Sequence, residues 1–318
     1  MRIVTSVLGL LAAVFVMNSP AIVQRPEGRF QQTLSVSGRV QLRIATAAGS
    51  IKVRKGDSNS VRIQAQIRAD SQGDAALVRD IEQNPPIRQS GNTVTIGTEV
   101  RRWDHVSISY EVTVPAETRV EARTGAGSVA VYDVAGPLDA VSGSGSVNAE
   151  NIGARVVVKS GAGSIAVSRA GGEVNATTGS GAMELNDIRG PANAESGSGS
   201  ISVSGATGRV RAHTGSGRIR VAKANADVDA NTGSGGIEVD GHPKSARWEL
   251  RTSSGSVTVS LPSGTGFELD AHAGSGRIST AHQLTRADAS GKHELRGLVG
   301  RPDNRIFIRT TSGSVRID

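Results

Sequence analysis

One pattern of apolar and polar residues repeats along the middle of the chain. A Thr/Ser-Gly-x-Gly-x-apolar-x-apolar unit begins at Thr124 and returns six times. The second glycines of these units are Gly127, Gly145, Gly163, Gly181, Gly199, Gly217 and Gly235. Every interval between them is 18 residues. A fixed period of about this length is typical of proteins that stack one small structural unit after another.

Within each unit the apolar positions have the period of a strand. Counted from the second glycine as position 0, positions 2, 4, 7 and 11 are apolar, position 13 is nearly always Ala, and position 15 is Ser or Thr. This alternation indicates strands with one buried face. Each unit therefore predicts a coil of two strands and two turns. Stacked coils predict an all-β protein, a parallel β-solenoid with two sheets around a thin core.

Two residue types in the repeat have an expected structural role. The paired glycines are expected to adopt a positive φ at the tight turn, which glycine does at no steric cost. The buried Ser/Thr hydroxyls at position 15 are expected to bond along their own column or to turn backbone, because buried polar groups need partners.

Both ends of the chain depart from the 18-residue period. Residues 22–123 predict a β-rich cap over the first coil, with one short amphipathic helix from Asp74 to Gln83. Residues 124–242 are expected to form the regular solenoid. In residues 243–318 the interval loosens at Gly255, Gly276 and Gly313, which predicts irregular coils and a second cap. Residues 281–304 predict a polar loop.

The first 21 residues have the features of a secretory signal peptide. Arg2 precedes an apolar run that ends at Met17, and Ser19-Pro20-Ala21 places small residues where a signal peptidase cleaves. The run is short for a membrane-spanning helix, which needs about 20 apolar residues. We expect an exported protein, periplasmic or on the cell surface. Cleavage of the signal and its retention as a membrane anchor are both open at this point.

The chain resembles the bacterial putative-adhesin family of β-strand repeat proteins, a family of unknown function. The resemblance covers roughly residues 30–318. It rests on the run Tyr110–Pro115 that leads into Thr124–Val129, on the Ser/Thr-Gly-Ser-Gly repeats, on Trp248–Val257 with Leu261-Pro262, and on Thr311–Val315. It implies an envelope-associated β-solenoid of adhesin type and brings no catalytic residues.

Composition and charge narrow the classes of function. The 318 residues include no Cys, two Trp, two Tyr and four Phe. A disulfide scaffold, a cysteine nucleophile and a thiolate zinc site are therefore excluded. The net charge of +7 is diluted over both ends rather than gathered in one stripe. With so few aromatic side chains to stack on bases, we expect no binding of nucleic acid.

The candidate interaction surface consists of four arginines and two tryptophans: Arg209, Arg211, Arg218, Arg220, Trp103 and Trp248. The 18-residue register also sets carboxylates beside arginines on neighbouring coils. The expected pairs are Arg209 with Asp227, Arg211 with Asp229, Arg220 with Glu238 and Arg155 with Glu173. The basic cluster is therefore expected to be mainly a ladder of ion pairs, each worth about 0.2–1 kcal/mol. The tryptophans are expected to be either surface anchors or core residues of the caps.

No constellation predicts a catalytic, cofactor or metal site. The turns carry no acid beside their glycines, as a calcium-binding β-roll requires. No nucleophile elbow stands between a strand and a helix, and no Lys-Ser/Thr follows a glycine loop. His282 and His293 lie near Asp288 and Glu294, but their spacing matches no known set of metal ligands.

These observations favour an exported, non-enzymatic β-solenoid that serves as a structural or interaction module of the cell envelope. Its expected partner is an envelope protein or a polysaccharide. A surface adhesin that binds other cells or a matrix is the first alternative. A polysaccharide-acting enzyme of the β-helix type is the second, and the narrow coil and the paired charges disfavour it.

Overall fold

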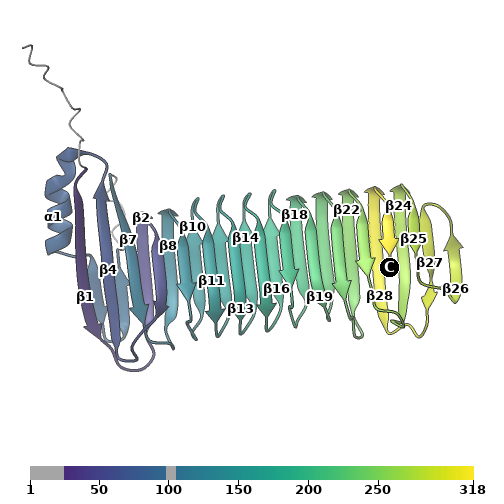
Figure 1. Ribbon diagram of the computed structural model, residues 1–318, viewed down its shortest axis with the longest axis horizontal. Helices are drawn as coiled ribbons and strands as arrows, with labels where there is room; N and C mark the ends of the chain where they lie inside the picture. Colours follow the sequence, from purple (N-terminus) through teal and green to yellow (C-terminus); the bar gives the residue numbers. More distant parts are fainter. Residues whose placement is uncertain (1–24, 98–104) are drawn as a thin grey trace, which may run out of the picture.

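Two long sheets face each other along the whole length of the protein (Figure 1). The computed structural model describes residues 25–97 and 105–318; the expected signal peptide and Trp103 lie outside these ranges. Sheet A runs in spatial order through β1 (Glu27–Ser35), β4 (Ser60–Ala69), β7 (Val106–Val114), β3 (Ile51–Lys55), β9 (Val129–Tyr132), β11 (Val147–Ile152), β13 (Ile165–Ala170), β15 (Met183–Ile188), β17 (Ile201–Ser204), β19 (Ile219–Ala224), β21 (Ile237–Gly241), β23 (Val257–Ser260), β29 (Val315–Ile317) and β25 (Ile278–Thr280).

Sheet B is built from the other strand of each coil. Its spatial order is β26 (Arg286–Ser290), β27 (Glu294–Val299), β24 (Phe267–Ser275), β28 (Asn304–Ser312), β22 (Arg247–Ser254), β20 (Val228–Ser234), β18 (Val210–Ser216), β16 (Ala192–Ser196), β14 (Val174–Thr178), β12 (Val156–Ser160), β10 (Leu138–Ser142), β8 (Arg119–Ala126), β2 (Gln41–Ala48), β6 (Thr93–Ile96) and β5 (Ile87–Ser90). A short 3-10 turn (Gln72–Asp74) leads into the helix α1 (Ala75–Gln83).

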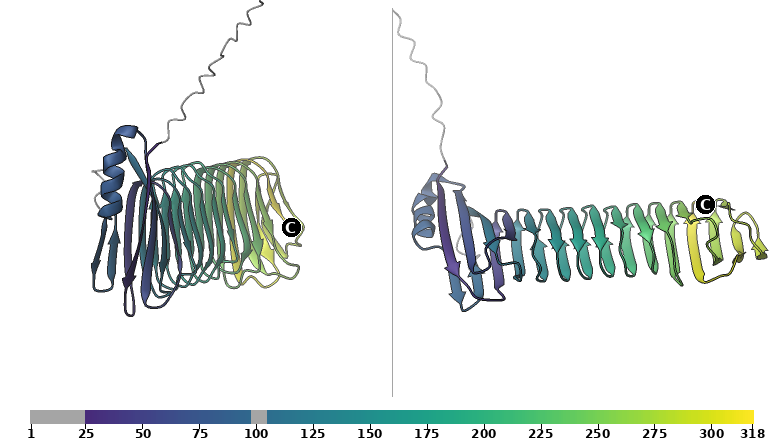
Figure 2. Two further views of the ribbon diagram at one scale, coloured as in Figure 1. Left: turned by 60° about the vertical axis from the view of Figure 1, so that its left-hand side comes forward. Right: turned by 60° about the horizontal axis from the view of Figure 1, so that its bottom comes forward.

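The regular coils pair in parallel with a register of 18 residues. Val147 on β11 lies beside Ile165 on β13, and Val156 on β12 lies beside Val174 on β14. The predicted all-β, parallel β-solenoid with two-strand coils is therefore confirmed. Figure 2 shows the coils side by side as a single stack.

The core between the sheets is thin and built from small side chains. The inner column of sheet B contains Ala140, Ala176, Ala194, Ala212 and Ala230, all at most 1% exposed. Opposite them, sheet A contributes buried Val, Ile, Leu and Met side chains. Short side chains on one sheet let the two layers approach closely along the regular coils.

The paired glycines are required for a different reason from the expected one. Of the seven second glycines, all of which lie within the described residues, only Gly127 has a positive φ, of 146°. A Cβ on Gly199 would lie 1.8 Å from the carbonyl oxygen of Gly181 on the coil below, and one on Gly145 would lie 1.9 Å from Gly127 O. Successive coils are only about 4.8 Å apart. The expected positive φ was wrong for the other six glycines, and close backbone approach is the cause.

Positive φ occurs instead at position 6 of the coil, where the chain leaves sheet A. Five non-glycine residues there have φ between 55° and 58°: Asp133, Asn151, Arg169, Asp187 and Lys223. Three of these are Asp or Asn, the types that tolerate this region best.

The buried hydroxyl column links each coil to the one below. Ser160 Oγ donates to the carbonyl oxygen of Gly145 at 2.9 Å and accepts from the backbone N–H of Gly163 at 2.8 Å. Ser142 and Ser196 make the equivalent pair of bonds. The expected bonding to turn backbone is therefore confirmed.

The N-terminal cap continues both sheets beyond the first regular coil. β4 pairs antiparallel with β7, and β1 pairs antiparallel with β4. Helix α1 packs beside β1 with Val78 and Ile81 buried, and so covers the end of the stack (Figure 2). The expected capping region with one short helix is confirmed. The strands of the cap do not stack in chain order. On sheet B, β2 lies between β6 and the first regular coil, and on sheet A, β3 lies between β7 and that coil.

The C-terminal end also departs from chain order. β28 lies between β22 and β24, and β29 lies between β23 and β25. The last coil in the sequence, formed by β28 and β29, is therefore the second-to-last coil in the stack, and we call it the inserted coil. The predicted polar loop over residues 281–304 was wrong, since β26 and β27 form a hairpin that pairs with β24. Leu295 on β27 is buried against the end of the core. The charged residues beside it obscure the apolar alternation by which a strand is predicted from the sequence.

Candidate interaction surfaces

The four predicted arginines do not form one surface. Arg211 lies on β18 of sheet B, and Arg209 immediately precedes that strand. Arg220 lies on β19 of sheet A, and Arg218 immediately precedes it. The two pairs are therefore on opposite faces of the solenoid. Neighbours in the sequence are separated because each coil crosses from one sheet to the other between them.

Each of these arginines lies beside a carboxylate on the next coil. The nitrogen–oxygen distances are 2.6 Å for Arg209–Asp227, 3.6 Å for Arg211–Asp229 and 3.1 Å for Arg220–Glu238. Arg155 and Glu173 are 3.5 Å apart. All four expected ion pairs are confirmed. Arg218 adds a fifth contact, with Glu238 at 3.9 Å.

The Asp227 carboxylate has two strong hydrogen-bond donors. The backbone N–H of Arg247 donates to it at 2.9 Å, and the Arg209 guanidinium donates at 2.6 Å. These bonds, in that order of effect, hold the pKa of Asp227 below its usual value. The same contact raises the pKa of Arg209. The ladder thus consists of charges that stabilise one another.

Trp248 is part of the core rather than an exposed platform. Its side chain is 0% exposed, and its indole N–H donates to the carbonyl oxygen of Ala226 at 3.0 Å. Along sheet B it stands in the inner column, between Val228 and Ile306. The alternation of the strand directs it inward, so its place in the predicted interaction surface was wrong. Trp103 lies outside the described residues.

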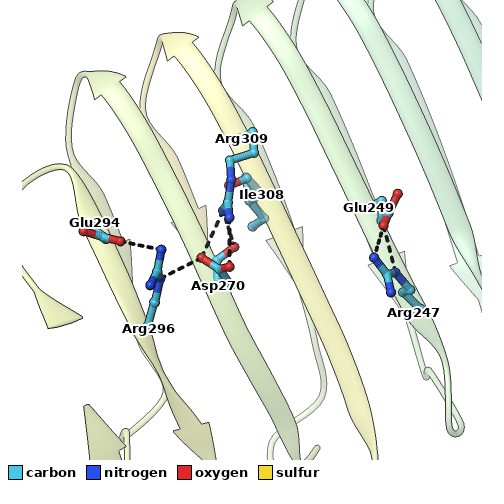
Figure 3. A network of polar contacts seen from close by, with 7 residues as sticks. All are labelled: Arg247, Glu249, Asp270, Glu294, Arg296, Ile308 and Arg309. Atoms are coloured by element: carbon cyan, nitrogen blue, oxygen red, sulfur yellow. Dashed lines mark hydrogen bonds and ion pairs between the residues drawn. The ribbon is translucent and has the colours of Figure 1, made fainter. Parts of the chain in front are cut away.

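A network of charges joins the C-terminal coils on the outer face of sheet B (Figure 3). Arg309 on the inserted strand β28 donates to both oxygens of Asp270 on β24, at 3.0 and 2.8 Å. Arg296 on β27 reaches the same carboxylate at 3.2 Å and Glu294 at 2.8 Å. Arg309 first, then Arg296, holds the pKa of Asp270 below its usual value. The network ties the inserted coil to the cap.

The outer face of sheet A is different, because short uncharged side chains cover its middle coils. Ser164, Ala166, Ala182, Ser200 and Ser202 line a shallow groove of about 660 Å³. Glu184, Arg218 and Arg220 border it, and both arginines point toward Glu238 on the next coil. Both arginines at this groove are therefore paired, while the Glu184 carboxylate accepts a hydrogen bond from the Asn186 amide at 2.8 Å.

A second groove, of about 620 Å³, lies on the outer face of the N-terminal part of sheet A. One row of its lining runs from Gln31 through Gln64 and Glu111 to Lys52, on β1, β4, β7 and β3. A parallel row holds Arg29, Gln66, Ser109 and Ser50. Phe30, Ala65 and Tyr110 lie between the rows, with their side chains buried on the other side of the sheet.

Sequence reasoning missed this N-terminal groove. Its lining comes from four strands whose spatial order, β1-β4-β7-β3, differs from their chain order. The alternation of Gln64 and Gln66 with buried residues on β4 indicates an outward face. That signal alone does not tell which other strands lie beside it.

Within the ranges 25–97 and 105–318, no three His, Asp or Glu side chains come together as a possible metal site. Over the same residues, no helix has both the length and the apolar character needed to cross a membrane.

Comparison with solved structures bears on the fold alone. The chain is similar over 91% of its length to a putative cell adhesion protein from Clostridium sporogenes (9% identity, 98% of that chain, TM-score 0.19). Over 91% it is also similar to putative adhesins from Bacteroides fragilis (11% identity, 97% of that chain, TM-score 0.33) and Parabacteroides distasonis (10%, 97%, 0.30). At these identities and scores the likeness bears on neither ligand nor activity. No curated protein matches the chain.

A family model supplies the stronger result. The model described as Toastrack DUF4097 matches residues 41–318, which run from the first coil strand β2 to the last strand β29. The expected resemblance to a bacterial family of adhesin-like repeat proteins is confirmed by this match. The chain belongs to the Toastrack DUF4097 family.

Proposed function

We propose that the protein is an exported, non-catalytic β-solenoid that acts as an interaction module of the cell envelope. The observation that carries this proposal is the in-register stacking of both sheets, from β2 to β29. Backbone pairing fixes the position of every outward side chain along the stack. A rigid array of fixed side chains suits binding to an extended partner, such as an envelope protein or a polysaccharide.

The state of the carboxylates supports a non-catalytic role. General acid–base catalysis needs a group whose pKa lies near the working pH. Asp227 and Asp270 have pKa values held below normal by arginines and backbone N–H groups, and Asp229 and Glu238 are also paired with arginines. The family and the three similar structures named above do not carry the name of an enzyme.

Export is supported by the N-terminal sequence. Arg2, the apolar run to Met17 and the small residues at Ser19 and Ala21 have the order of a secretory signal. Residues 22–318 would then form the exported part, either free after cleavage or held at the membrane by the uncleaved segment.

A surface adhesin that binds other cells or a matrix is the second candidate. It is favoured by the groove of short, uncharged side chains around Ala166 and Ala182, which leaves the backbone of sheet A open to a flat partner. This candidate requires that the stack is exposed outside the cell, whereas an envelope module can also act in the periplasm.

Protease treatment of intact and lysed cells, with the mature N-terminus determined by mass spectrometry, tests both candidates. Digestion on intact cells would favour the adhesin. Protection until the outer envelope is opened, with a mature start near Ile22, would favour the periplasmic module. Recovery with the cytosol, with Met1 or Arg2 still present, would contradict the proposal.

A further inference from the structure

The N-terminal groove of sheet A gathers polar side chains, several of which have no partner among the described residues. Its two rows, Gln31-Gln64-Glu111-Lys52 and Arg29-Gln66-Ser109-Ser50, are next to each other on the outward face of four paired strands. Outward rows on one face are about 7 Å apart along the strands. The groove between them is therefore narrow, polar and open to solvent.

Most charges around this groove are paired. Glu111 makes a close ion pair with Arg54, and Lys52 lies 3.7 Å from it. Arg68 pairs with Glu27 at 3.2 Å, and Arg62 with Asp57 at 3.8 Å. Among the described residues, the Arg29 guanidinium has no such carboxylate, although it is exposed and lines the groove. One cation is thus available to a ligand.

The glutamines are free in the same way. Within residues 25–97 and 105–318, the side-chain amides of Gln31, Gln64 and Gln66 make no hydrogen bond to the protein, and all three are exposed. Each amide offers two N–H donors and one acceptor oxygen. Three amides around one groove therefore provide a set of donors and acceptors that suits a ligand rich in hydroxyl groups.

The remaining chemistry of the groove distinguishes classes of ligand. Phe30, Ala65 and Tyr110 contribute only backbone to it, because their side chains are buried on the opposite side of the sheet. No apolar anchor is presented to a peptide, and no aromatic face to a nucleobase. Hydroxyl groups and one negative charge are what the exposed groups can bind.

We propose that this groove binds an acidic saccharide, with a sugar carboxylate on Arg29 and hydroxyl groups on Gln31, Gln64 and Gln66. This inference rests on the proposed role as an envelope interaction module, and it names the class of ligand. β1 is held in place beside the groove, because Glu82 of α1 accepts the backbone N–H of Arg29 at 2.7 Å. The Arg29 side chain consequently projects from a fixed strand edge.

Titration calorimetry with purified protein tests the site. The probes are a hexamer of galacturonic acid and, as the neutral comparison, a linear hexamer of glucose. The acidic probe is expected to bind more tightly and to weaken as salt is added, since an exposed ion pair is screened. Arg29→Ala is expected to weaken its binding about ten-fold or more, the loss of a charged hydrogen bond. Gln64→Ala with Gln66→Ala is expected to weaken both probes.

Arg123→Ala is the matched control, since Arg123 is an exposed arginine on the outer face of sheet B. It is expected to bind like the wild type, and an unchanged unfolding temperature shows that each variant is folded. The inference is overturned if neither saccharide binds, if Arg29→Ala and Arg123→Ala have equal effects, or if an acidic peptide of equal charge binds better than the saccharide. These outcomes do not concern export, which protease treatment of cells tests separately.

Discussion

The glycines at the tight turns are required for a steric reason, which single substitutions can test. At Gly199 a Cβ would lie 1.8 Å from Gly181 O, and that oxygen is backbone and cannot move aside. Gly199→Ala is therefore expected to lower the free energy of unfolding by about 2–4 kcal/mol. Gly73→Ala is the control, because the nearest atom to its Cβ would be Ser71 Oγ at 3.5 Å. Urea unfolding of both variants checks the difference, and equal stabilities would contradict it.

A second prediction at the scale of single residues concerns the buried hydroxyl column. Ser160→Ala removes the donor to Gly145 O and the acceptor for Gly163 N, which leaves two half-buried backbone groups without these partners. We expect a loss of about 1–3 kcal/mol in unfolding free energy. Ser168→Ala, on the outward face of the neighbouring strand β13, should change stability little. A loss of equal size in the two variants would show that the column is not an energetic feature.

Asp270 makes the stability of the C-terminal coils depend on pH. Its pKa is lower in the folded state, so its contribution is complete above the unfolded-state pKa of about 3.9 and is lost as the pH falls through the folded-state value. The stability difference between the wild type and Asp270→Asn should be constant above about pH 5 and should shrink below about pH 4.

Arg309→Gln should remove most of that pH dependence, since Arg309 has the largest effect on Asp270. Urea unfolding at several pH values measures both variants. A stability difference that stays the same from neutral to strongly acidic pH would contradict the assignment.

Single residues also show where sequence reasoning was sufficient. The pairs Arg209–Asp227 and Arg220–Glu238 could be predicted, because a constant period fixes which residues are neighbours on adjacent coils. The reason for the glycines could not, since it depends on the distance between backbones. The inward orientation of Trp248 follows from strand alternation, but only once its strand is aligned with β20 and β28.

At the scale of elements, the ends of the stack show what a repeat pattern leaves undetermined. The motif Thr-Ser-Ser-Gly-Ser-Val at 252–257 and the motif Thr-Thr-Ser-Gly-Ser-Val at 310–315 are nearly the same. Either segment can stack on any regular coil, so the sequence does not reveal that β28 and β29 lie inside the stack. Similarly, β2 and β3 are separated in the chain from the coil on which they pack.

Deletion of residues 304–318 tests the inserted coil. β24 pairs with β28 along its length, and the cap hairpin in turn pairs with β24. Without the inserted coil, we expect amide hydrogens in β24 and β27 to exchange nearly as fast as in an unstructured chain. β12 and β14, in the middle of the solenoid, should keep their protection because each coil is stabilised mainly by its direct neighbours. Full protection of β24 in the truncated protein would contradict the inserted topology.

At the scale of the whole molecule, the two outer faces have different chemistry. Both faces carry paired charges, from Arg155–Glu173 to Arg309–Asp270 on sheet B, and at Arg169–Glu150 and Arg220–Glu238 on sheet A. Sheet A carries short neutral side chains in its middle and the free amides with Arg29 at its N-terminal end. The groove that gathers the free amides around Arg29 is the place from which binding is expected, while the ion pairs on both faces contribute to the cohesion of the stack.

The most direct test of an envelope interaction module is co-sedimentation of the purified protein with isolated cell envelopes, followed by sizing of the envelope polysaccharide. We predict that wild-type protein and Arg123→Ala sediment with the envelopes, that Arg29→Ala does so less, and that the polysaccharide keeps its length. Failure of the wild type to sediment, or shortening of the polysaccharide during incubation, would contradict the account.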